Sequence, residues 1–276
     1  MNTAVAAAEG RPGLNRLALR STGILYFIVM VLIPVLVIFQ DGFSGGWGEF
    51  WHQVNLPIAA HAIRLSLWTS ALMAVINAIM GLATAYVLVR FDFPGRKFLN
   101  SIVDLPLAIP TLVTGVMLVI LYGPQEALGA FLKERLGLEI IFAPPGIVLA
   151  LLFVTLPLVV RTVQPVLMQA DRTQENAAAT LGAGSWTIFR RIVFPGILLP
   201  LANGTLLAFA RAIGEFGAIV IVAGNIPLYT QTAAVYVLGE VESENRLGAS
   251  AVSIVLMAVA FGVIWLSDWF FKRMEK

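Results

Sequence analysis

The stretch DRTQENAAATLGAGSWTIFRRIVFPGILLP, residues 171–200, is the only long segment between two apolar runs that is both basic and strongly patterned. Its Gly-Ala-Gly run at 182–184 predicts a sharp turn, because glycine adopts backbone conformations that other residues avoid. Ser185 is then placed to cap a second short helix, which Pro195 is expected to end. Apolar residues three or four apart in that helix predict one apolar face, made of Trp186, Ile188, Phe189 and Ile192. We interpret residues 171–200 as a docking element that offers this face to something other than lipid.

The composition of the chain indicates a membrane protein. Of its 276 residues, 59% are hydrophobic and only 12% are charged, which leaves too little polar surface to cover a soluble globule. Cysteine is absent, and this excludes disulfides, thiolate metal sites and cysteine nucleophiles. The sequence therefore predicts an all-α integral membrane protein without a sizeable soluble domain.

Six apolar runs approach or exceed the roughly 20 residues with which a helix crosses a 30 Å hydrocarbon core. They cover residues 22–39, 62–89, 102–122, 146–167, 196–223 and 248–271. The Ala-rich residues before the first run superficially resemble a signal sequence, but no small-x-small cleavage site follows that run. We therefore predict an N-terminal tail over residues 1–21 and a transmembrane domain over residues 22–276.

The distribution of positive charge predicts the topology. Of the eighteen Lys and Arg residues, twelve fall on the side of the two termini and of residues 171–200, and four fall on the other side. Because loops rich in Lys and Arg stay in the cytoplasm, both termini and residues 171–200 are expected there. The sequence therefore predicts a multi-pass membrane protein with both termini in the cytoplasm.

Four ionisable residues fall within the predicted spans: Asp104, Arg161, Arg211 and Glu215. Each costs about 2.5 to 3.5 kcal/mol at the centre of an isolated helix, so each should be paired or should face water. Asp104 and Arg161 lie at similar depth in neighbouring antiparallel spans, and Arg211 and Glu215 lie four residues apart on one helix face. These charges either form structural ion pairs or, at Arg211, offer a positive field to a passing anion.

Proline and glycine residues interrupt two spans. Pro106 and Pro110 remove two backbone donors four residues apart, so the third span should bend there. The bend either lines a water-filled path or packs against another helix. Gly214 and Gly217 allow bending or close helix approach in the fifth span, and packing alone explains them equally well.

The spacing within residues 171–200 resembles the EAA signature, EAA-x3-G-x9-I-x-L-P, of the membrane subunits of bacterial ABC importers. The signature is matched by Ala177, Ala178, Gly182, Ile192 and Pro195, whereas Asn176 replaces its Glu, with Glu175 adjacent, and Phe194 replaces its Leu. The resemblance implies a type I ABC importer permease fold with six transmembrane helices, in which residues 171–200 form a coupling loop seated on an ATPase subunit. An interfacial amphipathic helix lying on lipid is the alternative.

Other runs resemble the permeases of sulfate/thiosulfate and molybdate importers, above all the T-type subunits of the sulfate/thiosulfate systems. These runs are FPGR at 93–96, DLP at 104–106, VVRTVQPV at 159–166, RAIGEFGA at 211–218 and AGNI at 223–226. The resemblance implies a second, related permease subunit as heterodimer partner, with a homodimer as the alternative. It also implies two ATPase subunits, a periplasmic anion-binding protein and a multi-pass location in the lipid of the bacterial inner membrane.

The function implied by the resemblance is sulfate and thiosulfate import, with molybdate or tungstate import as the alternative. A secondary anion transporter or channel is a more remote possibility, and an intramembrane enzyme has no visible general base. No Gly-x4-Gly-Lys-Ser/Thr phosphate loop occurs in the chain, so it has no ATPase site of its own. ATP and Mg are expected on the partner ATPase, and no cofactor, metal or nucleic acid is expected on this chain.

Overall fold

The computed structural model describes residues 12–274, and this part of the chain is helical without a β-strand. The predicted all-α class is therefore confirmed. In chain order the elements are α1 (Pro12–Phe27), the π-helical turn η1 (Ile28–Leu32), α2 (Ile33–Gly42), α3 (Gly46–Asn55), α4 (Pro57–Arg90), α5 (Arg96–Ile102), α6 (Leu105–Ala108), α7 (Thr111–Tyr122), α8 (Ala127–Leu136), α9 (Pro144–Gln169), α10 (Thr173–Thr180), α11 (Ser185–Ile188), the π-helical turn η2 (Phe189–Val193), α12 (Phe194–Ile213), α13 (Gly217–Ala223), α14 (Ala233–Glu242) and α15 (Arg246–Met274).

Within residues 12–274, five helices are long and apolar enough to cross a membrane: Leu19–Gly42, Pro57–Arg90, Pro144–Gln169, Ser185–Ile213 and Arg246–Leu266. A sixth span results if the bent pair of Arg96–Ala108 and Thr111–Tyr122 forms one crossing. Helix α1 already begins at Pro12, so the boundary predicted after residue 21 does not mark the start of the helix. Residues 1–11 of the expected tail lie outside the described residues.

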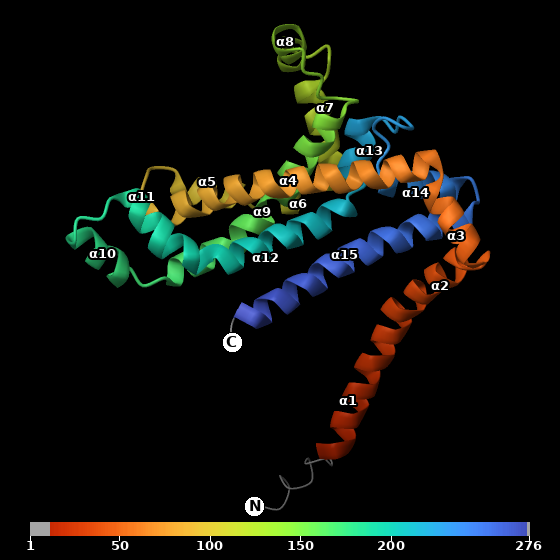
Figure 1. Cartoon of the computed structure of the whole chain (residues 1–276), viewed down its shortest axis with the longest axis horizontal. Helices are drawn as coiled ribbons and strands as arrows, with labels where there is room; N and C mark the ends of the chain where they lie inside the picture. The colour runs from red at the N-terminus through yellow and green to blue at the C-terminus, as the bar shows by residue number, and fades with distance from the viewer. Residues whose placement is uncertain (1–11, 275–276) are drawn as a thin grey trace, which may run out of the picture.

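The long helices α4, α9 and α12 form the centre of the bundle, and α15 lies along α12 (Figure 1). The apolar window of the first span is not buried anywhere inside the chain, and α1 diverges from the bundle in the figure. Helices α10 and α11 lie at one end of α4 and α12, whereas α3 and α14 lie at the other end (Figure 1). The bundle thus has an α10–α11 end and an α3–α14 end.

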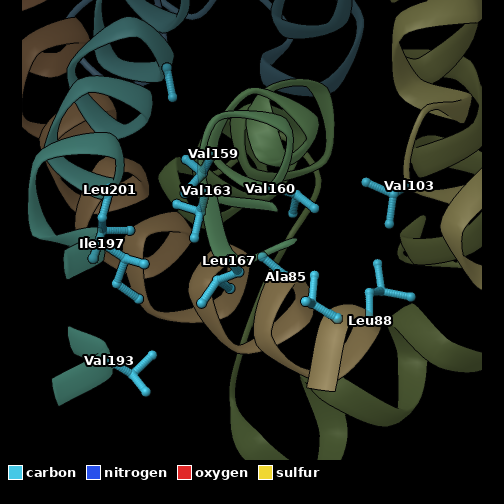
Figure 2. Packing of buried hydrophobic residues seen from close by; sticks show 12 residues of the cluster. Ala85, Leu88, Val103, Val159, Val160, Val163, Leu167, Val193, Ile197 and Leu201 are labelled. Atoms are coloured by element: carbon cyan, nitrogen blue, oxygen red, sulfur yellow. The ribbon is translucent and has the colours of Figure 1, made fainter. Parts of the chain in front are cut away.

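The core beside the α10–α11 end is built from one face of α9. Val159, Val163 and Leu167 recur every four residues and are fully buried, as expected for a helix side that faces the core. Figure 2 shows them between side chains of α4 and α12. Those neighbours include Ala85, Leu88, Ile197 and Leu201.

A polar contact also joins α4 to α9 within the bundle. The buried Asn77 amide donates to Thr155 Oγ1 at 2.9 Å and to the Leu152 carbonyl at 3.2 Å. In a bilayer such a side chain has few competing partners, so interhelical hydrogen bonds of this kind help to fix helix pairs.

The third span is broken rather than merely kinked. Its two parts, Arg96–Ala108 and Thr111–Tyr122, are bent by 111°. Pro106 lies in the first turn of α6 and Pro110 immediately precedes α7. Proline is tolerated at both places because the first turn of a helix leaves its N–H groups unpaired in any case. The predicted bend at these prolines is therefore confirmed, but it is a break at which two helices begin and not a kink within one helix.

The fifth span also differs from the prediction, at both ends. A continuous helix runs from Ser185 to Ile213, so Pro195 does not end a short docking helix as expected. The backbone N–H of Phe194 bonds to the Phe189 carbonyl, five residues back, in the turn η2. This π-type bond shifts the hydrogen-bond ladder just before Pro195, which lacks a donor. The helix then stops before Glu215, and α13 begins after the break.

The two half-helices beyond the breaks, α7 and α13, pack closely against each other. A Cβ added to Gly217 would lie 2.2 Å from Thr111 Oγ1, and one added to Gly115 would lie 2.8 Å from the Ala218 carbonyl oxygen. Both glycines are therefore required by close approach, which was one of the two alternatives for Gly217. Neither short helix could pack this way with a larger residue at these positions.

Candidate functional site

The α10–α11 segment matches the predicted helix–turn–helix in outline. Gly182 has φ +84° and no heavy atom within 4 Å of the position of an added Cβ. The glycine is thus required by the left-handed backbone of the turn and not by crowding. Gly184, not Ser185, is the residue that precedes α11, and no side chain caps this helix. The predicted Ser185 cap is therefore wrong.

The apolar face predicted for the second helix is divided between two environments. Ile188 and Phe189 pack against the core cluster of α4, α9 and α12, and the Phe189 ring lies 5.3 Å from that of Tyr86 in α4. Trp186 and Leu181 are strongly exposed. The core residues hold α11 in place, and Trp186, together with Leu181 after α10, offers apolar surface outward.

The residues of the signature are spread over the same segment. Asn176 and Ala177 are exposed on α10, as is Gly182 in the turn, while Ala178 and Ile192 are half-buried and Pro195 is exposed on α12.

The start of α10 is fixed by Asp171. Its carboxylate accepts hydrogen bonds from the Thr173 backbone N–H at 2.9 Å and from the Thr173 hydroxyl at 2.7 Å. These two bonds hold the pKa of the Asp171 carboxyl below its ordinary 3.8, and the bond from the Thr173 hydroxyl has the larger effect. The contact is therefore fully formed above about pH 4 and is lost as the pH falls through the lowered pKa.

Glu175 points back to the bundle and not outward. Arg90, the last residue of α4, donates from Nη2 to Glu175 Oε1 at 2.5 Å, and the two side chains are 7% and 18% exposed. Arg90 Nε is buried and has no hydrogen-bond partner in the described part of the chain. The ion pair ties α10 to α4, while α10 otherwise packs on α11 and η2. Arg90 was missed from the sequence, because nothing in the pattern indicates which residue lies opposite Glu175.

Asp104 and Arg161 form the centre of a hydrogen-bond network between the third and fourth spans. Arg161 Nε donates to Asp104 Oδ1 at 2.6 Å and its Nη2 to Asp104 Oδ2 at 2.6 Å. The same guanidinium donates to the Asn100 carbonyl at 2.6 Å, to the Asn100 side chain at 2.8 Å, and to Gln164. All five N–H groups of Arg161 are therefore used. Asn100 and Gln164 were not singled out from the sequence.

Arg211 and Glu215 also form an ion pair, but they do not share a helix face. Arg211 Nη1 lies 2.8 Å from Glu215 Oε2 across the break between α12 and α13. Glu215 is 2% exposed and also accepts the backbone N–H of Ala218 at 3.0 Å. Arg211 is 44% exposed and has no other partner within residues 12–274. Most of its donors therefore remain available to a solute or water.

The structure does not bring the two ion pairs into one site. Arg161 lines a cavity of about 1000 Å³ together with Arg96, Lys97 and Asn100 near the α10–α11 end, and Arg211 does not line it. Pro106 is buried in α6, whereas Pro110 is exposed at the break. In the described part of the chain, no three His, Asp or Glu side chains lie close enough together to hold a metal ion.

Comparison with known proteins agrees with this architecture. The model of the family described as binding-protein-dependent transport system inner membrane component matches residues 77–276. The probable sulfate transport system permease protein cysT of Zygnema circumcarinatum is 38% identical over 248 residues, 90% of this chain and 86% of that protein. Sulfate permease 2, chloroplastic, of Chlamydomonas reinhardtii is 39% identical over 88% of this chain and 66% of that protein.

Two solved structures share the fold at low sequence identity. A chain of the bacterial alginate ABC transporter, solved in complex with an alginate pentasaccharide-bound periplasmic protein, has a TM-score of 0.79 at 17% identity and covers 95% of this chain and 96% of its own. A chain of the inward-facing MetNI methionine ABC transporter has a TM-score of 0.58 at 15% identity, covering 78% and 94%. The predicted type I ABC importer permease fold is thus confirmed.

The family match, the relatives and the fold agree with one another over most of the chain. The chain therefore belongs to the family of binding-protein-dependent transport system inner membrane components, the membrane permeases of ABC importers.

Proposed function

We propose that this chain is the permease subunit of an ATP-driven importer for sulfate and thiosulfate. The observation that carries the proposal is the set of relatives named as sulfate permeases, which are 36% and 38% identical over 87% and 90% of this chain. Thiosulfate is included because the local runs at 159–166 and 223–226 resemble those of the sulfate/thiosulfate systems. ATP and Mg would be bound by partner ATPase subunits, since the sequence contains no phosphate loop.

The α10–α11 segment is the proposed docking surface for one of two ATPase subunits. Its outward residues include the strongly exposed Leu181 and Trp186, which suit a groove lined by apolar side chains. Glu175 cannot serve as a free acidic contact while it is bound to Arg90. We infer instead that the Arg90–Glu175 pair passes displacement of α10 to α4.

Arg211 is the proposed contact of the translocated anion. Its side chain is 44% exposed and its guanidinium holds one partner, and an arginine fork suits the oxygen atoms of an oxyanion. Glu215 lowers the net field but keeps Arg211 in place. A weak and partly cancelled site is suited to a path, because an anion bound too tightly would not leave.

Complete transport requires further subunits. We propose a second, related permease, which would close the other side of the path, and a periplasmic anion-binding protein that selects the substrate. The alginate transporter, whose permease chain shares this fold, is seen in complex with a periplasmic protein. Both termini are proposed to lie on the cytoplasmic side together with α10–α11, on the basis of the positive-charge distribution.

Uptake of labelled sulfate tests the substrate. The assay uses membrane vesicles that contain the complete importer, its binding protein and ATP, with excess thiosulfate or molybdate as competitor. Competition by thiosulfate but not by molybdate is expected. Competition by molybdate alone would replace the proposal with molybdate import, and ATP-independent uptake would indicate a secondary transporter.

Single cysteines test the proposed orientation in this cysteine-free chain. Cysteine is introduced at Ser185 in the α10–α11 segment, or at Gln125 or Ser243 on the opposite side, and labelled with a thiol reagent that does not cross the membrane. Labelling from outside is expected at 125 and 243 only. Labelling of position 185 in intact cells would reverse the topology.

A further inference from the structure

A groove of about 630 Å³ lies at the α3–α14 end of α4, between α3, α4 and α15. Its wall on α4 includes Ile63, Arg64, Leu67 and Trp68, which follow the spacing of one helix face. Val255 of α15 adds apolar surface to the same groove. Its lining is largely apolar around one cation.

Arg64 is an unpaired cation in this setting. Its side chain is exposed, and within residues 12–274 it has neither an ion pair nor a side-chain hydrogen bond. Arg90 and Arg161, by contrast, each hold a carboxylate. An arginine next to apolar surface without a partner has unsatisfied donors, and phosphate oxygens match their fork geometry.

The position of Arg64 along α4 places it near the membrane boundary. The 34 residues of α4 extend about 51 Å, whereas the hydrocarbon core is about 30 Å thick. A helix that crosses symmetrically therefore leaves about 10 Å, or seven residues, outside the core at each end. Arg64 is the eighth residue of α4, so its side chain can reach the headgroup layer from the edge of the core.

Two tryptophans mark the same boundary. Trp51 on α3 and Trp68 on α4 both line the groove and are both exposed. Tryptophan prefers the layer between hydrocarbon and water, because its ring is apolar and its N–H is polar. The groove thus combines interfacial aromatic residues, one free guanidinium and an apolar floor.

We propose that this groove binds a phospholipid with an anionic headgroup from the leaflet at the α3–α14 end. The phosphate accepts hydrogen bonds from Arg64, and the upper part of an acyl chain lies along Leu67, Trp68 and Val255. Trp51 and Ile63 flank the glycerol region. The negative headgroup complements the one cation of the groove, and the site does not depend on the transported substrate.

Quenching of Trp68 fluorescence by brominated lipids tests this site directly. The full chain carries Trp68 alone, with Trp47, Trp51, Trp186, Trp265 and Trp269 changed to Phe, and is reconstituted with its partner subunits. In one set of vesicles brominated phosphatidylglycerol competes with unbrominated phosphatidylcholine, and in a second set the bromine is on phosphatidylcholine instead. The difference in quenching between the two sets gives the preference of the groove for the anionic lipid. About fivefold preference is expected, the contribution of one basic residue near an anionic surface.

The control variants separate this site from general attraction of anionic lipid. Arg64→Gln should abolish the preference and Arg64→Lys should keep part of it. Arg246→Gln, which removes an exposed arginine at the same end of the bundle, should leave the preference unchanged. If Arg64→Gln shows the same preference for the anionic lipid as the unchanged protein, the proposal is overturned. It is also overturned if no lipid quenches Trp68, because the groove is then covered by the second permease subunit.

Discussion

The two intramembrane arginines Arg161 and Arg211 both hold a carboxylate, yet their surroundings differ. Arg161 uses all five N–H groups on Asp104, Asn100 and Gln164, whereas Arg211 holds Glu215 and is 44% exposed. A saturated guanidinium has no donor left for a solute, so the first arginine joins helices and the second remains available. Charge within a span is thus not sufficient to identify a path, and the number of unused donors distinguishes the two cases.

The largest expected effect concerns the saturated arginine. Arg161→Gln should lower the free energy of unfolding by about 3 kcal/mol, because five hydrogen bonds of the guanidinium are lost together. The ion pair itself contributes only part of this loss, since its side chains are 30% and 50% exposed. Thermal unfolding and folded yield in detergent would measure the loss. Asp104→Asn should cost less, since Arg161 keeps three of its bonds, and strict additivity in the double variant would show that the two residues do not interact.

A smaller loss is expected at the ion pair between α4 and α10. Glu175→Gln should cost about 2 kcal/mol, the value of a hydrogen bond to a charged group, because it leaves the 7% exposed Arg90 without a carboxylate. Arg90→Gln should cost less, since Glu175 can turn to solvent. ATP hydrolysis and uptake, measured together in vesicles, should become uncoupled in both variants. Arg172→Gln, which removes an exposed arginine of the same segment, is the control and should remain coupled.

For the available arginine, transport should fall more than stability. Arg211→Gln is expected to cost about 1.5 kcal/mol of unfolding free energy, because Glu215 stays buried with one N–H donor. The double variant Arg211→Gln with Glu215→Gln removes the orphaned charge and should regain part of this stability without regaining sulfate uptake. Full uptake in either variant would give Arg211 the same structural role as Arg161 and remove the contrast.

The smallest effect on stability is expected where no charge is involved. Gly182→Val should cost about 1 kcal/mol, because φ +84° is unfavourable for a side chain, and should weaken co-purification with the ATPase. Gly184→Val is a matched control two residues away, at φ −70° and equally free of neighbours. If both substitutions release the ATPase, bulk on the docking surface is responsible and not the turn.

The fold class and the approximate positions of the spans could be predicted because bilayer thickness and hydropathy determine them almost alone. The pairing of Asp104 with Arg161 followed from depth, and the need for Gly182 from its place in a turn. A bend near Pro110 was predicted, but that the helices end completely there and before Glu215 could not be, since proline fits the start of a helix as well as a kink. Arg90 lies 85 residues from Glu175, and only the packed bundle brings them together.

The helix that runs through Pro195 connects two places that the sequence suggested were separate. Ser185 beside the docking surface and Arg211 at the break belong to the same uninterrupted helix, about 39 Å apart along its axis. If this helix pivots about the core residues around Ile197, a displacement of the end that carries Trp186 moves the guanidinium of Arg211 in the opposite direction. Deletion of a single residue in η2 would shorten this helix and rotate the part that carries Trp186 by about 100° about the helix axis relative to Arg211.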